Sequence, residues 1–267
     1  IYPDTIESGG TKHADLIKTH HNRVPRIQEM IAKGKIIEPI KELYKDEVRA
    51  IGLELGLPKN LLFRHPFPGP GLGIRCLCSS GSDEMVEQIN FEGEVIYKLP
   101  IKSVGVQGDE RSYAHPGLLI HDKIDWNFLT KISPQITNKH KEFNRVLALI
   151  YGDKNKLTES KVSRAYLTSN RLELLRKIDS IVNKYIIDSP DNKHIWQLPI
   201  VLVPFGYNKK ESVVLRPVES EEAMTVSWAR IDKKILDEIT NEIKKLDLVD
   251  YIFYDTTNKP PGTIEWE

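Results

Sequence analysis

Polar residues near the start of the chain have the composition of a segment that contacts phosphates. Asp4 and Glu7 are carboxylates three residues apart, and carboxylate oxygens beside a phosphate are natural Mg²⁺ contacts because magnesium prefers hard oxygen ligands. Lys18, His20 and His21 follow in a polar, glycine-flanked stretch. A lysine with two imidazoles suits transient contacts with phosphates or with a charged intermediate.

A rigid turn is predicted at Pro66 to Gly73, which holds three prolines and three glycines in eight residues. Prolines fix the backbone shape in advance, and glycines let main-chain N–H groups approach a ligand closely. Arg64 and Arg75 flank the segment. This composition favours a ligand-binding turn, with a plain linker between domains as the alternative.

Arg111 and the final residues are further candidates. Arg111 follows a predicted strand and the turn residues Gly108 and Asp109, where a guanidinium can bind a phosphate through two parallel hydrogen bonds. The alternative is a surface ion pair with Asp109 or Glu110.

Residues 259–267 combine lysine, glutamate and tryptophan with a Pro-Pro-Gly turn. Chain ends usually fray, and so stiff a tail indicates a docked segment.

Regular elements must position these residues. Residues 1–30 read as irregular, and a helix is expected over 39–55, where apolar residues recur at spacings of three and four and Gly56 supplies the stop. Its opposite face carries Lys41, Lys45 and Asp46. That face is either solvated, with ion pairs one turn apart, or directed at a ligand.

From about residue 76 the pattern changes to short strands with helices between them. Strands are expected over 99–106, 145–151, 198–203, 212–215 and 249–254. Helices are expected over 172–185, capped by Asn170, and over 235–246, behind Asp232.

A faint internal repeat accompanies these elements. Residues 98–101 resemble 197–200, and 145–151 are echoed by 249–254. Two related α+β units would explain both echoes; chance similarity between apolar strands is the alternative.

The composition narrows the class of protein. The 267 residues can bury a core in one large or two modest domains, and 40% apolar with 28% charged residues is an ordinary globular balance. The formal charge is zero, so we expect neither nucleic acid nor a membrane as a partner.

Cys76 and Cys78 lie two residues apart. This spacing fits neither a zinc site nor a disulfide framework, and it indicates a reducing compartment, the cytoplasm. No metal site is expected from the histidines, because their spacings match no zinc pattern.

Several stretches, in the same order, resemble the glutamine-hydrolysing GMP synthetases, in their eukaryote-type arrangement. They are residues 2–10 and 18–22, which resemble that family's lid region, and residues 38–49, 64–71, 104–111 and 259–267. The resemblance implies an α/β and α+β fold. Residues 1–75 would end a parallel-sheet ATP-pyrophosphatase domain with its lid, while 76–155 and 156–267 would form two related small α+β dimerisation-type units.

The resemblance also implies an activity. In this family ATP adenylates the O2 oxygen of xanthosine 5′-monophosphate (XMP), and ammonia derived from glutamine then displaces AMP at C2 to give GMP. The implied catalytic residues are Lys18, His20, His21 and Asp46, and those on the ATP and Mg²⁺ side are Asp4, Glu7, Lys41 and Lys45. The implied XMP-binding residues are Pro68, Gly69, Pro70, Gly71, Arg111, Gln197, Lys259, Ile264 and Glu265.

Some family features are absent from the chain. It has neither the Ser-Gly-Gly-x-Asp-Ser pyrophosphate loop nor an amidotransferase Cys-His-Glu set, and Arg23-Val24-Pro25 follows Asn22 where bacterial members have Gly-Gly-Leu-Pro. We therefore expect the C-terminal part of a longer protein, catalytically incomplete by itself, with an amidotransferase domain upstream and a homodimeric assembly. The alternatives are a non-catalytic nucleotide-binding or dimerisation module derived from such an enzyme, and another ATP-pyrophosphatase that amidates a different substrate.

Overall fold

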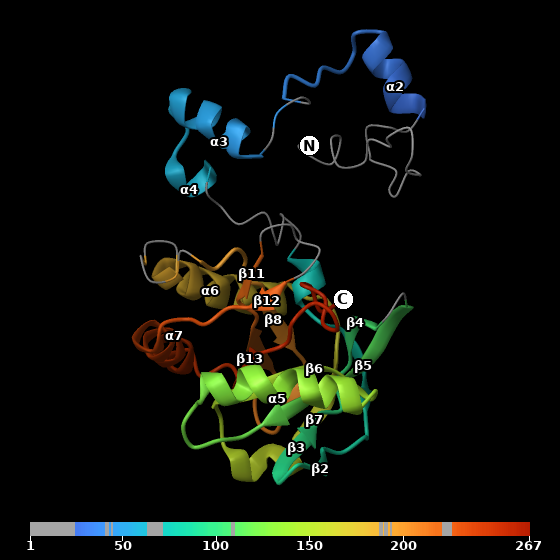
Figure 1. Ribbon diagram of the computed structural model, residues 1–267, viewed down its shortest axis with the longest axis vertical. Helices are drawn as coiled ribbons and strands as arrows, with labels where there is room; N and C mark the ends of the chain where they lie inside the picture. Colours follow the sequence, from blue (N-terminus) through green and yellow to red (C-terminus); the bar gives the residue numbers. More distant parts are fainter. Residues whose placement is uncertain are drawn as a thin grey trace. The chain divides into compact units, whose positions relative to one another are not determined.

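The structure is a computed structural model (Figure 1) that describes residues 25–40, 43, 45–62, 72–107, 110–186, 189, 192, 194–220 and 226–267. The chain divides into two units, residues 1–64 and residues 65–267.

The first unit contains short helices in its described part. They are α2 (Pro25–Ala32), α3 (Lys45–Glu54) and α4 (Lys59–Leu62). The expectation that residues 1–30 are irregular is wrong for the residues that form α2. It is amphipathic, yet none of its side chains is buried.

The predicted helix over 39–55 is shorter than expected. Pro39 and Ile40 lie in a turn, in which the Leu43 N–H donates to the Ile40 carbonyl over 3.2 Å, and α3 begins only at Lys45. The predicted stop is confirmed, because Gly56 follows the helix with a φ of +75° that favours glycine.

The second unit is built on an eight-stranded sheet. Seven of its strands lie in the order β2-β3-β5-β6-β13-β10-β8, and β4 pairs with β5. Their bounds are β2 (Glu87–Phe91), β3 (Glu94–Lys98), β4 (Ser103–Gln107), β5 (Glu110–Leu119), β6 (Phe143–Tyr151), β8 (Ile200–Val203), β10 (Ser212–Leu215) and β13 (Tyr251–Asp255).

The sheet has two halves with the same pairing. In one half β3 is antiparallel to β5, and β5 continues through helix α5 (Trp126–Lys139) to the parallel strand β6. In the other half β8 is antiparallel to β10, and β10 is parallel to β13, with α7 (Lys233–Lys245) between them in the chain. Strands β6 and β13 pair antiparallel at the centre of the sheet. They occupy equivalent positions in the two halves, so the similar segments 145–151 and 249–254 correspond to equivalent strands. The other echo does not, because residues 98–101 follow β3 whereas 197–200 lead into β8.

Both faces of the sheet are covered. Helices α5, α6 (Ser169–Ile186) and α7 cover one face of the sheet with apolar side chains. On β10, Val213 and Leu215 point to this face and pack against them. Val214 points to the other face, which packs against a three-stranded sheet. The small sheet consists of β1 (Ser79–Ser82), β7 (Lys161–Ala165) and β9 (Phe205–Gly206). Burial on both faces explains why the central strands are almost continuously apolar in sequence.

Several element boundaries differ from the prediction. The strand expected over 99–106 begins only at Ser103, as β4, because the segment before it contains Pro100, which has no N–H to donate to a ladder. Asn170 lies inside α6, and the hydroxyl of Thr168 accepts the Arg171 N–H instead. Asp232 is confirmed as the cap of α7, since its carboxylate accepts backbone N–H groups of the first turn. Helix α5 was not predicted.

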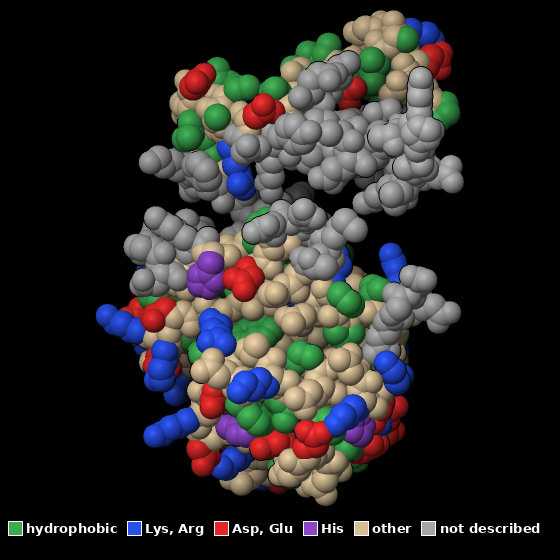
Figure 2. All heavy atoms as spheres, viewed as in Figure 1, with side chains coloured by type: hydrophobic (Ala, Val, Ile, Leu, Met, Phe, Trp, Pro, Cys, Tyr) green, Lys and Arg blue, Asp and Glu red, His purple; other side chains and the backbone are tan. Residues whose placement is uncertain are grey.

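Both predicted α+β units contribute strands to the one large sheet, so their division at residue 155 stays a prediction. On the face shown in Figure 2, lysine and arginine side chains lie among aspartate and glutamate side chains, in keeping with the zero formal charge. Among the described helices, none has the length and apolar character needed to cross a bilayer.

Candidate functional site

The final ten residues are docked against the second unit. The Lys259 N–H donates to the Val226 carbonyl over 2.7 Å, and the Val226 N–H donates to the Lys259 carbonyl over 3.2 Å. Further along, Val106 donates to the Pro261 carbonyl (2.7 Å) and Val104 to the Trp266 carbonyl (2.9 Å). The tail therefore lies beside β4, and the prediction of a docked segment is confirmed.

Close approach between the tail and β4 depends on Gly105. A Cβ atom at this position would lie 2.6 Å from the Pro261 carbonyl oxygen and 2.8 Å from the Ser112 hydroxyl. Both distances are shorter than real Cβ contacts, so a side chain here and the docked tail exclude each other.

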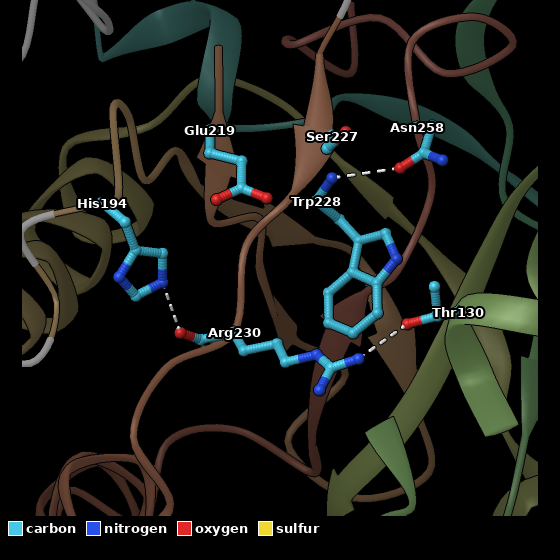
Figure 3. A pocket seen from close by; sticks show the side chains of 7 residues that line it. All are labelled: Thr130, His194, Glu219, Ser227, Trp228, Arg230 and Asn258. Atoms are coloured by element: carbon cyan, nitrogen blue, oxygen red, sulfur yellow. Dashed lines mark hydrogen bonds between the residues drawn. The ribbon is translucent and has the colours of Figure 1, made fainter. Parts of the chain in front are cut away.

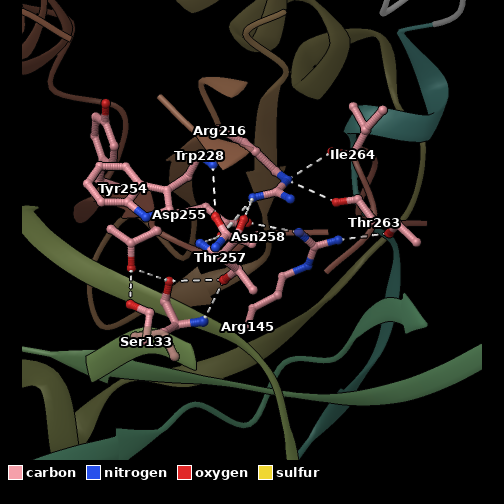
Figure 4. A network of polar contacts seen from close by, with 12 residues as sticks. Ser133, Arg145, Arg216, Trp228, Tyr254, Asp255, Thr257, Asn258, Thr263 and Ile264 are labelled. Atoms are coloured by element: carbon pink, nitrogen blue, oxygen red, sulfur yellow. Dashed lines mark hydrogen bonds and ion pairs between the residues drawn. The ribbon is translucent and has the colours of Figure 1, made fainter. Parts of the chain in front are cut away.

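A fully buried ionic triad lies behind the tail (Figure 4). Asp255 at the end of β13 pairs with Arg145 of β6 over 2.9 Å and with Arg216, which follows β10, over 3.0 Å. All three side chains have no exposed surface. Charges in such an environment require partners for nearly every polar atom.

Some of the remaining guanidinium donors reach the tail, whereas Arg145 Nε donates to Ser103 and the buried Arg216 Nη2 has no hydrogen-bond partner. Arg145 Nη2 donates to the Thr263 hydroxyl (2.9 Å) and to the Glu265 carbonyl (2.6 Å). Arg216 Nε donates to the carbonyls of Thr263 (2.9 Å) and Ile264 (3.1 Å). The buried Trp266 indole N–H donates to Asp255 over 3.0 Å. The tail is thus held by charge-assisted hydrogen bonds, which are roughly twice as strong as neutral ones.

Charge states in the triad follow from burial and pairing. Burial lowers the pKa of Arg145 to about 9 against the raising effect of Asp255, so the guanidinium stays charged at neutral pH. Burial alone would raise the pKa of Asp255, but Arg216, Arg145 and the Thr257 N–H together place it below its ordinary value. Burial likewise lowers the pKa of Arg216 against the raising effect of Asp255.

Two predicted ligand residues, Gln197 and Lys259, pair with the two sides of a short hairpin. Together with the hairpin they form one small layer of extended backbone. Strands β11 (Val218–Glu219) and β12 (Ser227–Trp228) are antiparallel. Gln197 exchanges both backbone hydrogen bonds with Val218 on one side, and Lys259 does so with Val226 on the other. Because residues opposite each other in an antiparallel pair project to the same face, the Gln197 and Lys259 side chains share one face of this layer.

Two buried acceptor oxygens near the tail have no hydrogen-bond partner. They are Oε1 of Gln197 and Oε1 of Glu265. Gln197 is 1% exposed, and burial raises the pKa of the Glu265 carboxyl. An unsatisfied buried acceptor costs about 1–3 kcal/mol, so a ligand that donates N–H groups would relieve both.

A cavity of about 280 Å³ adjoins the same hairpin (Figure 3). Its lining residues are Thr130, His194, Glu219, Ser227, Trp228, Arg230 and Asn258. Glu219 and Ser227 pair across the hairpin and alternate with Val218 and Trp228, so they project to the face opposite Gln197 and Lys259. Trp228, which lies opposite Val218, also lines the cavity, so the cavity borders both faces of the hairpin.

Comparison with known proteins gives this geometry a family. Residues 186–266 match the family described as the GMP synthase C terminal domain. The whole chain is 46% identical over 278 residues to a probable glutamine-hydrolyzing GMP synthase of Leptospira interrogans, of which it covers 46%. The chain matches the C-terminal part of GMP synthase. It is also 31% identical, again over its full length, to the GMP synthases of Caenorhabditis elegans (probable) and Dictyostelium discoideum, of which it covers 47% and 46%. The chain thus spans about half the length of these relatives.

Four of the predicted XMP residues lie in the hairpin layer and the docked tail. Gln197 and Lys259 flank the β11–β12 hairpin, while Ile264 and Glu265 are bound through their carbonyls to Arg216 and Arg145. Their relation to XMP stays a prediction.

Arg111 lies apart from this group. It pairs with Val106 across β4 and β5, and its side chain is exposed. Strand β4 separates Arg111's strand from the tail, and its phosphate contact stays a prediction.

The other predicted residues lie outside what the structure describes. The side chains of Lys45 and Asp46 at the start of α3 are among them. So are Asp4, Glu7, Lys18, His20, His21, Lys41, Pro68, Gly69, Pro70 and Gly71. Within the described ranges, no group of three or more His, Cys, Asp or Glu side chains could hold a metal ion.

The sequence reading missed the triad. Arg145 was treated as the first residue of an apolar strand, and Arg216 and Asp255 received no role. A signal was present, because each is a charged residue at the edge of a strand that is otherwise apolar, and such charges are rarely fully buried unless they are paired.

Proposed function

We propose that this chain forms the XMP-binding part of a glutamine-hydrolysing GMP synthase, a ligase of purine biosynthesis. The full enzyme would adenylate XMP with ATP and replace the adenylate with ammonia that an amidotransferase domain releases from glutamine. The relatives that align with the entire chain are named GMP synthases, so the alternative of a non-catalytic module is not favoured. A homodimeric assembly in the cytoplasm belongs to the same proposal.

The observation that carries the proposal is the pair of unpartnered acceptors on Gln197 and Glu265 beside the docked tail. A xanthine ring presents both N–H donors and carbonyl acceptors at its edge. Gln197 Oε1 and Glu265 Oε1 can accept such donors, while the half-buried Lys259 ammonium can donate to a ring or phosphate oxygen. These residues would bind and orient XMP.

The ATP and Mg²⁺ part of the proposal rests on Asp4, Glu7, Lys41 and Lys45, with Lys18, His20, His21 and Asp46 in the catalytic role. When bound, Mg²⁺ would neutralise phosphate charge on ATP. The side chains named in this part of the proposal lie outside the described residues.

Lys259→Ala in the full-length protein tests the proposal. Loss of one charge-assisted contact should cost about 1.5–3 kcal/mol, or roughly tenfold to a hundredfold in XMP affinity. The measurement is a calorimetric titration with XMP, with glutaminase activity as the check that the rest of the protein is intact. Lys233→Ala is the matched control, because Lys233 is 85% exposed on α7 and pairs only with Asp237. An unchanged XMP affinity in Lys259→Ala contradicts the proposal.

A further inference from the structure

The buried triad differs in what it holds from another ion pair of this unit, whose side chains are 10% and 15% exposed. Arg171 of α6 pairs with Glu211 through two hydrogen bonds (2.6 and 3.1 Å) and otherwise donates to the carbonyl of Tyr166. None of these partners belongs to the tail. Arg145 Nη2 and Arg216 Nε, by contrast, both donate to tail atoms (Figure 4).

The tail atoms that accept these hydrogen bonds belong to the consecutive residues Thr263, Ile264 and Glu265. Arg216 binds the carbonyls of Thr257, Thr263 and Ile264, and Arg145 binds the carbonyl of Glu265. No strand of the described chain includes residues 256–267. The carbonyl directions of Thr263, Ile264 and Glu265, and therefore the direction of the Glu265 side chain, are set by two guanidinium groups.

Stability by itself explains such a triad poorly. Replacing a buried ion pair with apolar residues of similar size is often neutral or stabilising, because the cost of removing charges from water offsets their attraction. What the triad supplies is geometry: two rigid guanidinium forks, fixed in turn by both carboxylate oxygens of Asp255, direct hydrogen bonds to defined positions.

We propose that Arg145, Asp255 and Arg216 are positioning residues for XMP, which act through the backbone of residues 263–266. They hold the tail so that the Glu265 carboxylate and the Lys259 ammonium keep the orientation in which they bind the nucleotide. This inference rests on the proposed function of the tail and adds to it the residues that determine its shape.

Arg216→Lys in the full-length protein is the central test. Lysine keeps the positive charge beside Asp255 but loses the fork that binds the Thr263 and Ile264 carbonyls. We expect the Michaelis constant for XMP to rise at least tenfold, while that for ATP and the turnover number change less than threefold. Deuterium uptake at the amides of residues 258–267 should increase, since their backbone is no longer fixed.

The matched control is Arg171→Lys, which makes the same exchange in a buried arginine–carboxylate pair remote from the tail. It should lower the melting temperature and leave the Michaelis constant for XMP within twofold of the parent. If Arg171→Lys raises that constant as much as Arg216→Lys does, the effect is a general loss of stability and the proposal is overturned. An unchanged constant in Arg216→Lys overturns it as well.

Thr263→Val covers the case in which Arg216→Lys does not fold. It preserves the shape of the side chain and every buried charge but removes the hydroxyl that accepts from Arg145. A threefold or greater rise in the Michaelis constant for XMP supports the proposal, and no change contradicts it. The proposed function itself is tested separately: if the parent protein fails to bind XMP, or Lys259→Ala binds it normally, the tail is not the XMP site.

Discussion

A methyl group added at Gly105 is expected to displace the tail and weaken XMP binding. The alanine Cβ would lie 2.6 Å from the Pro261 carbonyl oxygen, 2.8 Å from the Ser112 hydroxyl and 2.9 Å from the Asn144 Cβ. Overpacking of this kind costs about 1–3 kcal/mol. The hydrogen bond from Val106 to Pro261 would also weaken, at about 0.5–1.5 kcal/mol. We therefore expect a loss of about 2 kcal/mol in tail docking.

If XMP binds only to the docked tail, a penalty of about 2 kcal/mol lowers XMP affinity by up to roughly 30-fold. Calorimetric titration of Gly105→Ala with XMP measures this directly. Gly117→Ala is the control: its Cβ would lie 2.8 Å from the Ile96 side chain and near Phe143, a similar clash away from the tail. Normal XMP affinity in Gly105→Ala, or an equal loss in both variants, refutes the reasoning.

Three further predictions concern charged residues. Arg111→Lys should raise the Michaelis constant for XMP at least about tenfold, equivalent to about 1.4 kcal/mol, without lowering the melting temperature; a normal constant would leave Arg111 as an exposed surface residue. Because burial raises the pKa of Glu265 and a ligand N–H would bind its ionised form, XMP affinity should increase as pH rises through that pKa. Glu265→Gln should remove this dependence, and an identical pH profile in the variant would contradict the assignment. Burial would raise the pKa of Asp255, but the two arginines hold it below the ordinary value, so its contribution to stability is complete above that value and is lost as pH falls through the folded-state pKa. Asp255→Asn should lower the free energy of unfolding at pH 7 by about 3–5 kcal/mol in urea titrations, and a loss below 1 kcal/mol would contradict a coupled triad.

Local patterns were sufficient for part of the fold. The strand over 212–215 and the cap at Asp232 are where the sequence places them, because an apolar β-branched run and an N-cap carboxylate depend on their nearest neighbours. Helix α5 was missed although Leu129, Ile132 and Ile136 lie on its buried face, because Pro134 and several polar residues interrupt the pattern. The sequence places Pro100 in a strand, but Pro100 lies in the segment between β3 and β4, where it has no N–H to donate to a neighbouring strand.

The sequence by itself indicated the resemblance to GMP synthases and the mixed α/β class, since motifs depend on residue type and order. It also indicated a docked tail, because the composition of residues 259–267 is unusually stiff. Only the tertiary structure decided what the tail docks against and what fixes it. Arg145, Arg216 and Asp255 are separated by up to 110 residues along the chain, and their meeting depends on β6, β13 and β10 being neighbours in one sheet. Pairing between such distant residues is set by the register of the sheet and the burial of both its faces, and no local pattern in the sequence carries that information.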